Sequence, residues 1–136
     1  MESNLPDAEL THKIIGCAMF VHRTLKNGFP EAVYQRTLEI EMRDSGIAFS
    51  REHEMPIHFK NELIGTRRVD FLVEGRISLE LKAIIRLEDV HIAQALNYLE
   101  AYNIPIGLLI NFGAKSLDFH RLFNKKFKLG SNEQSK

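Results

Sequence analysis

The stretch RRVDFLVEGRISLELKA, residues 67–83, decides the fold, because it places two short apolar runs on either side of a turn. Runs of this kind, separated by a glycine-containing turn, predict a β-hairpin close to the protein core. Three charged residues, Asp70, Glu80 and Lys82, nevertheless interrupt the apolar runs. Ionised groups are costly to bury unless they are paired or bind a metal ion. The hairpin is therefore the first candidate for a functional site.

The length of the turn decides whether these charges share a face of the hairpin, because opposed residues of an antiparallel pair point the same way. A two-residue loop of Gly75 and Arg76 would send Asp70 to the face opposite Glu80. A three-residue loop, residues 74–76 with Gly75 as a candidate for positive φ, would place Asp70 opposite Glu80. In that register Asp70, Glu80 and Lys82 share one face, and the other face is apolar: Val69, Phe71, Val73, Leu79 and Leu81.

Two carboxylates and a lysine on one face can form a site for a divalent metal ion. Mg²⁺ prefers one or two carboxylates together with water and phosphate oxygens. A lysine beside them can stabilise charge that develops on a phosphate. The alternative is an ion pair of Lys82 with Glu80 or Asp70, and the spacing alone favours this alternative, since charges are common in edge strands.

The rest of the chain predicts one α/β domain with a central mixed sheet flanked by helices, in the order α-α-β-β-β-α-β-β. Helices are predicted at residues 7–26, with Asp7 as N-cap, at 30–44 and at 88–103. A first strand is predicted near 56–60, with a turn at 61–62 and a short continuation, and further strands at 67–73, 77–83, 104–112 and 116–123. The continuous apolar run at 104–112 is typical of a strand covered on both faces. We expect residues 1–128 to form the domain and residues 129–136 to be a flexible tail.

Composition excludes several classes of protein. The 136 residues carry a formal net charge of zero, so bulk positive charge does not identify a nucleic-acid binder. The single cysteine, Cys17, lies in an apolar helical stretch and fits a core residue of a protein from a reducing compartment. No signal peptide is visible, and the apolar runs are too short to span a bilayer. We expect a cytoplasmic protein without a membrane partner.

Three motifs resemble one family. The pattern D-x9-E-L-K from Asp70 to Lys82 resembles the core signature of the PD-(D/E)XK nuclease superfamily. The stretch GFPEAVY, residues 28–34, resembles the motif that names the GxxExxY protein family. The stretch AQALNYL, residues 93–99, contains a Q-x3-Y pattern similar to that of exonuclease-like branches of the superfamily. The resemblance extends over nearly the whole chain.

This resemblance implies a restriction-endonuclease-like core and an Mg²⁺- or Mn²⁺-dependent nuclease site on the central hairpin. Asp70 and Glu80 would correspond to metal ligands, and Lys82 to the lysine that positions the attacking water. Glu31 matches a position at which superfamily members often add a carboxylate. Its place near a helix N-terminus has a second explanation, because acidic side chains are favoured at that end of the helix dipole.

The remaining motif residues have alternative roles. Tyr34 lies one turn after Glu31 and could donate a hydrogen bond in the site or pack on the sheet. Gln94 and Tyr98 share one helix face, and the shared motif places them in the site. His91 lies on the same row, where a solvent-facing residue is the preferred interpretation.

Basic residues could contact a phosphate backbone: Arg67, Arg68, Lys115 and Arg121. At zero net charge, a solvated surface balanced by acidic residues is the alternative. The leading hypothesis is a metal-dependent nuclease that acts on nucleic acid, with DNA favoured over RNA. The competing hypotheses are a noncatalytic module that binds nucleic acid or protein with the same fold, and a purely structural ion pair. The size of the chain is compatible with a homodimer or a larger assembly.

Overall fold

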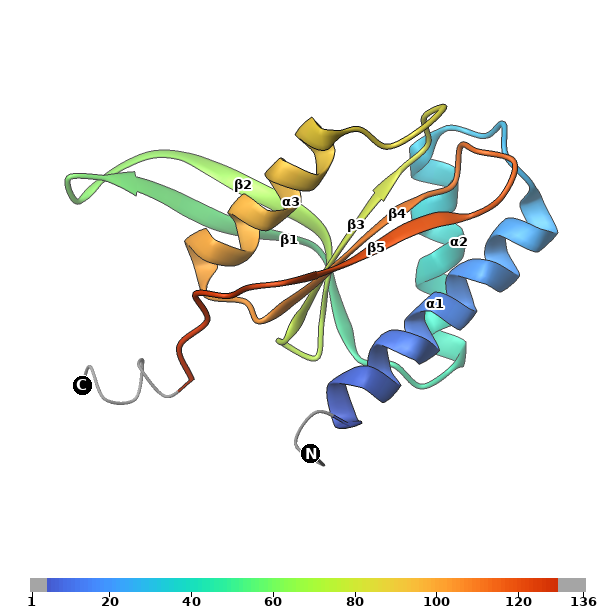
Figure 1. Ribbon diagram of the computed structural model, residues 1–136, viewed down its shortest axis with the longest axis horizontal. Helices are drawn as coiled ribbons and strands as arrows, with labels where there is room; N and C mark the ends of the chain where they lie inside the picture. Colours follow the sequence, from blue (N-terminus) through green and yellow to red (C-terminus); the bar gives the residue numbers. More distant parts are fainter. Residues whose placement is uncertain (1–4, 130–136) are drawn as a thin grey trace.

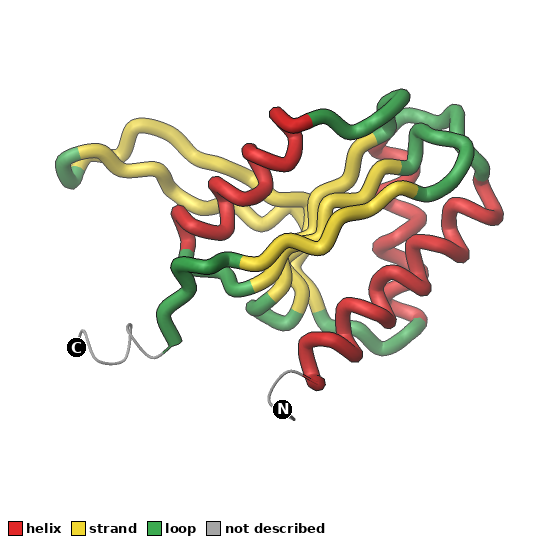
Figure 2. The backbone as a smooth tube through the Cα atoms, viewed as in Figure 1, coloured by secondary structure: helices red, strands yellow, loops and turns green. Residues whose placement is uncertain are grey.

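The computed structural model describes residues 5–129 and consists of three helices and a five-stranded mixed sheet (Figures 1 and 2). The elements are α1 (Leu5–Leu25), α2 (Glu31–Asp44), β1 (Phe49–Phe59), β2 (Glu62–Val73), β3 (Ile77–Lys82), α3 (Asp89–Tyr102), β4 (Ile106–Asn111) and β5 (Asp118–Phe123). This order and the α/β class confirm the prediction. Residues 130–136 of the predicted tail lie outside the described residues.

The strands are ordered β1-β2-β3-β4-β5 across the sheet. All neighbouring pairs are antiparallel except β3 and β4, which are parallel and are connected through α3. Helices α1 and α2 cover one face of the sheet, and α3 covers the other (Figure 1). Because Ile77, Leu79 and Leu81 of β3 pack beneath α1 and α2, the alternate residues Ser78, Glu80 and Lys82 point to the face that α3 covers.

The core consists of two clusters separated by the sheet. Leu108 and Ile110 of β4 pack into the larger cluster beneath α1 and α2, and Leu109 packs into the smaller cluster beneath α3. These three leucine and isoleucine side chains are at most 1% exposed. The prediction that residues 104–112 form a strand covered on both faces is therefore confirmed.

The central hairpin has the three-residue loop. Val73 pairs with Ile77, and the pairing ends at Phe71 and Leu79. Gly75 has a φ of 70°, in the left-handed region that glycine adopts without strain. This register, continued by one residue, places Asp70 opposite Glu80.

The predicted apolar face is wrong at Val69, which packs into the α3 cluster, whereas Phe71 and Leu79 pack into the α1–α2 cluster. The reason is a local distortion of the neighbouring strand. Glu52 of β1 has a φ of 53°, and the β1–β2 ladder omits a pair between Glu52 and Asp70. Strand β2 therefore changes its orientation between Val69 and Phe71, so that these two side chains lie on opposite faces of the sheet.

Strands β1 and β2 are longer than predicted and form a two-stranded arm that projects past α3 (Figure 1). Strand β1 begins at Phe49, well before the predicted start at residue 56, and β2 begins at Glu62 rather than at Arg67. The charged segment before Met55 shows no apolar period, because much of it is exposed on both faces.

Helix α1 begins at Leu5, so the prediction of Asp7 as its N-cap is wrong. Asp7 instead lies in the first turn, where its carboxylate accepts a hydrogen bond from Arg76 Nε at 2.6 Å. Within residues 5–129, no helix is both long and apolar enough to cross a membrane.

Candidate functional site

The candidate site lies where β2 and β3 separate. The ladder stops at the pair of Phe71 and Leu79, so the backbone N–H of Leu81 has no carbonyl of β2 opposite it. Leu81 instead donates its N–H to Oδ2 of Asp70 at 2.7 Å. The Asp70 carboxylate therefore takes the place of the missing strand partner, and the gap between the strands opens beside Glu80.

The second oxygen of Asp70 is held by helix α2. Gln35, which is only 8% exposed, donates from Nε2 to Oδ1 of Asp70 at 2.9 Å. The other end of the same amide, Oε1, accepts a hydrogen bond from Arg51 Nη1 at 3.2 Å. Because an arginine can only donate, this contact fixes which end of the Gln35 amide faces Asp70. Asp70 is thus held at both oxygens in one orientation.

Three carboxylates near this gap have raised pKa values. Burial raises the pKa of Asp70 above its ordinary range, and the hydrogen bonds from Leu81 and Gln35 oppose this effect. Burial and then the charge of Asp70 raise the pKa of Glu80. Glu31 lies exposed at the rim, where partial loss of water and the charge of Asp70 raise its pKa. The group carries more negative charge than its surroundings compensate.

Lys82 lies close enough to lower the pKa of Asp70, Glu80 and Glu31. Within residues 5–129, however, its amine makes no hydrogen bond and no ion pair with any of them. The close ion pair that the spacing alone favoured is therefore absent from the described part of the chain. The amine is free to bind a further group.

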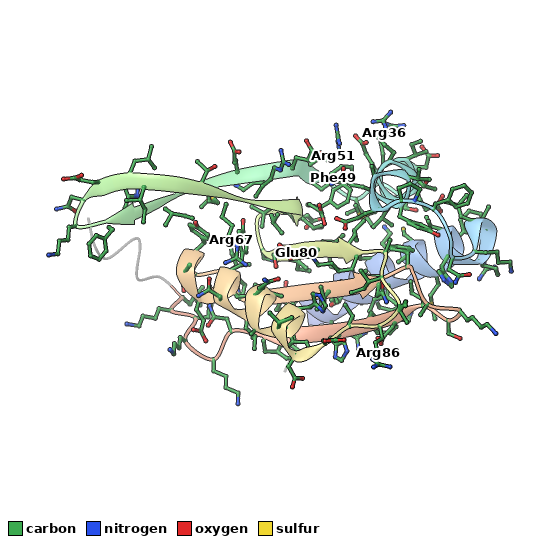
Figure 3. All side chains as sticks on the ribbon, turned by 90° about the horizontal axis from the view of Figure 1, so that it is seen from above. Arg36, Phe49, Arg51, Arg67, Glu80 and Arg86 are labelled. Atoms are coloured by element: carbon green, nitrogen blue, oxygen red, sulfur yellow. The ribbon has the colours of Figure 1, made fainter. Side chains whose placement is uncertain are left out.

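A cleft of about 580 Å³ leads to this gap along helix α3. Its lining residues come from β2, β3 and α3: Arg67, Glu80, Val90, Ala93, Gln94 and Asn97. Arg67 crosses between the walls, donating from Nη1 to Oδ1 of Asn97 at 2.6 Å and from Nη2 to the backbone carbonyl of Gln94. Figure 3 shows Arg67 and Glu80 in the space between β2 and α3. The predicted residues Arg67, Glu80 and Gln94 are therefore brought together.

Tyr98 lies beneath this cleft with an unpaired hydroxyl. The side chain is 1% exposed, and no described residue forms a hydrogen bond with its hydroxyl. The Arg67 guanidinium lies 5.3 Å from the centre of its ring. Burial, followed by the proximity of Tyr102 and Glu80, raises the pKa of Tyr98 to about 12. The hydroxyl is therefore a protonated donor at neutral pH.

Tyr34 and His91 have partners elsewhere. The Tyr34 hydroxyl donates to the backbone carbonyl of Lys26 and accepts from the N–H of Phe29 at 3.2 Å, and its ring stacks on Phe112 with centroids 4.8 Å apart. Tyr34 thereby holds the loop that precedes Glu31. His91 closes a capping box at the start of α3, where Nδ1 accepts from the N–H of Glu88 at 2.9 Å.

The four predicted nucleic-acid contacts do not form one patch. Arg67 lines the cleft, and Arg68 is exposed on the arm. Arg121 is paired with Leu108, whose side chain packs beneath α1 and α2, so Arg121 faces that side of the sheet. Lys115 is exposed in the loop between β4 and β5. The structure brings neither Lys115 nor Arg121 to the cleft.

Two residues at the site were not identified from the sequence. Gln35 had no distinguishing pattern, because it is a single amide within an amphipathic helix. Asn111 lies at the end of β4, and its side chain is fully buried. Its Oδ1 accepts hydrogen bonds from the backbone N–H of Ile84 at 3.0 Å and of Gly113 at 3.1 Å, and its Nδ2 donates to the carbonyl of Ile84 at 2.9 Å. Asn111 thereby fixes the segment that follows Lys82. The one feature of the sequence that could have indicated this role is a polar residue at the end of an apolar strand.

The donor set fits a divalent ion that keeps part of its water shell. Within residues 5–129, no three His, Cys, Asp or Glu side chains are placed so that they could hold a metal ion together, so Glu31 does not join Asp70 and Glu80 as a third ligand there. Mg²⁺ needs only one or two carboxylates, with water and phosphate oxygens completing the shell. Burial raises the pKa of both Asp70 and Glu80, because it disfavours their ionised forms, and a bound cation would stabilise those forms.

Comparison with known proteins agrees with this geometry. The family described as the PD-(D/E)XK nuclease superfamily matches residues 8–122. The crystal structure of SSO0001 is similar with a TM-score of 0.56 and 16% sequence identity, over 69% of this chain and 50% of that one. The chain thus spans about half of SSO0001, and at this identity the likeness concerns the fold alone. No curated protein matches the sequence.

Proposed function

The chain belongs to the PD-(D/E)XK nuclease superfamily, and from this premise we propose that it is a metal-dependent nuclease that hydrolyses phosphodiester bonds. Members of the superfamily generally use divalent metal ions and act on nucleic acid. The finer assignment to the GxxExxY family rests on Gly28, Glu31 and Tyr34. Mg²⁺ or Mn²⁺ is the proposed ion, and DNA is the proposed substrate.

One observation carries the proposal: Asp70, held at both oxygens, is near enough to Glu80 and Glu31 to raise their pKa values, beside a lysine that pairs with none of the three in residues 5–129. A cluster of this kind costs stability, because burial disfavours the ionised carboxylates and their charges repel one another. Perturbed groups of this kind cluster at functional sites. A structural ion-pair network would instead pair Lys82 with a carboxylate.

Each residue then has a defined role. Asp70 and Glu80 hold the metal ion, and Glu31 at the rim adds charge to the same group. A bound divalent ion supplies Lewis-acid stabilisation of a phosphate oxygen and lowers the pKa of a bound water. The Lys82 amine orients the attacking water and stabilises negative charge on the phosphate. Gln94, which lines the cleft, offers a donor to the substrate, whereas Tyr98 supports the cleft from beneath.

The test is cleavage of single- and double-stranded DNA and RNA with Mg²⁺ or Mn²⁺, comparing the wild type with Lys82→Ala. We expect Lys82→Ala to lose about 10²–10³ in rate, as when one preorganised electrostatic contact is removed. Lys13→Ala, an exposed lysine of α1, is the matched control and should cleave normally. The proposal fails if no substrate is cleaved with either ion, or if Lys82→Ala cleaves as fast as the wild type.

A noncatalytic binding module is the competing outcome of this experiment. It predicts that nucleic acid is bound without cleavage, with an affinity that does not respond to divalent ions. Asp70→Asn would then leave binding unchanged. The nuclease assignment instead predicts that Asp70→Asn abolishes cleavage and removes the response to the ion, because Asp70 is then a metal ligand.

A further inference from the structure

The segment between α1 and α2 leads into the motif residues Gly28, Glu31 and Tyr34, of which the proposed function uses only the carboxylate. Glu31 is the first residue of α2, and its carboxylate makes no hydrogen bond and no ion pair in the described part of the chain. Burial, followed by the charge of Asp70, raises its pKa, and Lys82 lowers it, so the carboxylate lies near both residues. Its position therefore depends on the backbone that precedes α2.

Tyr34 holds this backbone from within the core. Its side chain is fully buried, and its hydroxyl donates to the carbonyl of Lys26 and accepts from the N–H of Phe29 at 3.2 Å. The hydroxyl thus bridges two backbone groups on either side of Gly28. Because an unpaired backbone group is costly away from water, this bridge restrains the turn that leads into α2.

Gly28 permits the turn that Tyr34 bridges. Its φ is 120°, a conformation that residues with a side chain rarely adopt. A Cβ atom at this position would meet no atom within 4 Å, so the backbone conformation, and not a lack of space, requires glycine here. The three motif residues therefore form one unit, in which Gly28 permits the turn, Tyr34 holds it and Glu31 lies at its end.

The ring of Tyr34 connects the same unit to the backbone of Lys82. It stacks on Phe112, with centroids 4.8 Å apart and planes 14° from parallel. The N–H of Phe112 donates to the carbonyl of Lys82 at 2.8 Å. Figure 1 shows the loop between α1 and α2 beside the loop between β4 and β5, where Asn27 donates from Nδ2 to the carbonyl of Gly113 at 3.3 Å. Tyr34 therefore holds the start of α2 through its hydroxyl and packs on the support of Lys82 through its ring.

We propose that Tyr34 is a positioning residue, which acts together with Gly28 and through Glu31 on the affinity of the site for a divalent ion. This inference rests on the proposed function and adds a role for the motif. The turn that Tyr34 holds fixes the Glu31 carboxylate relative to Asp70. Within residues 5–129, Glu31 is not placed as a third ligand, so it contributes as a negative charge at the rim. Groups that support a metal site from outside its ligand set change its affinity by about 10–100-fold.

The test is calorimetric titration of the full chain with Mn²⁺, without nucleic acid, for Tyr34→Phe, Glu31→Gln and the double variant. Glu31→Gln should weaken Mn²⁺ binding about tenfold, because the ion loses an attractive charge nearby. Tyr34→Phe alone should weaken it about threefold or more, because the Glu31 carboxylate is no longer held in place. In the Glu31→Gln protein, Tyr34→Phe should change the affinity by less than about twofold, since no charge is left to position. A tyrosine with a merely structural role would cause the same loss in both proteins.

A second set of variants makes the test independent of the tyrosine. Gly28→Ala strains the turn without a clash, and it should weaken Mn²⁺ binding in the same Glu31-dependent way even if Tyr34→Phe does not fold. Gly16→Ala is its matched control, because Gly16 is a helical glycine of α1 with the same open space around it. Tyr102→Phe is the control for Tyr34→Phe, because the Tyr102 hydroxyl also donates to a backbone carbonyl but lies on α3. Both controls should leave the affinity unchanged.

Hydrogen exchange of the metal-free protein gives a readout that does not depend on the ion. The Phe29 N–H should exchange about tenfold faster in Tyr34→Phe than in the wild type, because the turn opens more easily, and at an unchanged rate in Tyr102→Phe. The inference is overturned if this rate does not change in Tyr34→Phe, or if the wild type binds no Mn²⁺. It is also overturned if Tyr34→Phe and Gly28→Ala bind Mn²⁺ as tightly as the wild type, or lose the same affinity with and without the Glu31 carboxylate.

Failure of this inference is distinguishable from failure of the nuclease assignment. The inference is tested by binding of the ion alone, and the assignment by cleavage of nucleic acid. If the chain cleaves DNA but Tyr34→Phe loses the same Mn²⁺ affinity with and without the Glu31 carboxylate, only the inference fails. If no substrate is cleaved but the loss depends on Glu31, the inference stands and the catalytic assignment fails.

Discussion

Gln35→Met is expected to destabilise the protein in a way that depends on the charge of Asp70. The substitution keeps the length of the side chain but removes the Nε2 donor that lies 2.9 Å from Oδ1 of Asp70. Among residues 5–129, the Leu81 N–H then remains as the only donor to this carboxylate. Arg51 keeps its ion pairs with Glu39 and Glu52, so the substitution leaves no isolated charge behind it.

The magnitude follows from the type of hydrogen bond that is lost. A hydrogen bond to a charged group contributes about 1.5–3 kcal/mol, and one between neutral groups about 0.5–1.5 kcal/mol. Because the Gln35 amide stabilises the ionised form, its removal raises the pKa of Asp70 further. The full loss of stability is therefore present above the pKa of Asp70, and the loss becomes smaller as the pH falls through that pKa.

The assay is urea unfolding of the wild type and Gln35→Met between acidic and neutral pH. Arg36→Met controls for the loss of a polar side chain from the same helix, and its effect should stay within about 1 kcal/mol, because its pair with Glu39 is a surface contact. In an Asp70→Asn background, the pH dependence of the Gln35→Met effect should disappear. A loss that is the same at every pH, or that is below about 0.5 kcal/mol at neutral pH, would refute the reasoning.

Three further predictions concern the same site. Glu80→Gln should abolish cleavage and raise the free energy of unfolding at neutral pH. Because the pKa of Glu80 is raised in the folded protein, the ionised carboxylate destabilises the fold only as the pH rises through that pKa. Urea unfolding should therefore show no increase in stability from the substitution at acidic pH. Mg²⁺ or Mn²⁺ should raise the Tm at neutral pH, less in acid, and not in Asp70→Asn, as measured by calorimetry. Tyr98→Phe should leave stability unchanged or increased, because it removes a buried hydroxyl without a partner, and a loss above about 1 kcal/mol would show that the hydroxyl has a structural partner.

The sequence was most informative where a local pattern has a single structural solution. The order of elements follows from hydrophobic period and from helix and turn signals, and the structure confirms it. The register of the central hairpin depended only on the loop length, and the pair of Val73 and Ile77 confirms the three-residue loop. The start of β1 was not predictable, because residues 50–52 are exposed, and Phe49 and Met55 pack against clusters on opposite faces of the sheet, so no single buried face imposes a period of two.

The sequence was least informative where a residue acts through a distant partner. Gln35 is one amide among the polar residues of α2, and its role depends on Asp70, which lies 35 positions later in the chain. Asn111 likewise depends on Ile84, across the parallel pair of β3 and β4. Neither pattern has a fixed spacing, because these separations are set by the elements that intervene.

The candidate site and the arm have one structural origin. If the β2–β3 ladder continued past Phe71 and Leu79, the Leu81 N–H would bond to the backbone of β2, and Asp70 would have no backbone donor. The ribbon beyond it would also lie within the sheet rather than project from it. The separation of the two strands therefore gives Asp70 its orientation and frees the arm at the same residue. A change that alters where the strands separate should therefore displace the Asp70 carboxylate and lower the rate of cleavage.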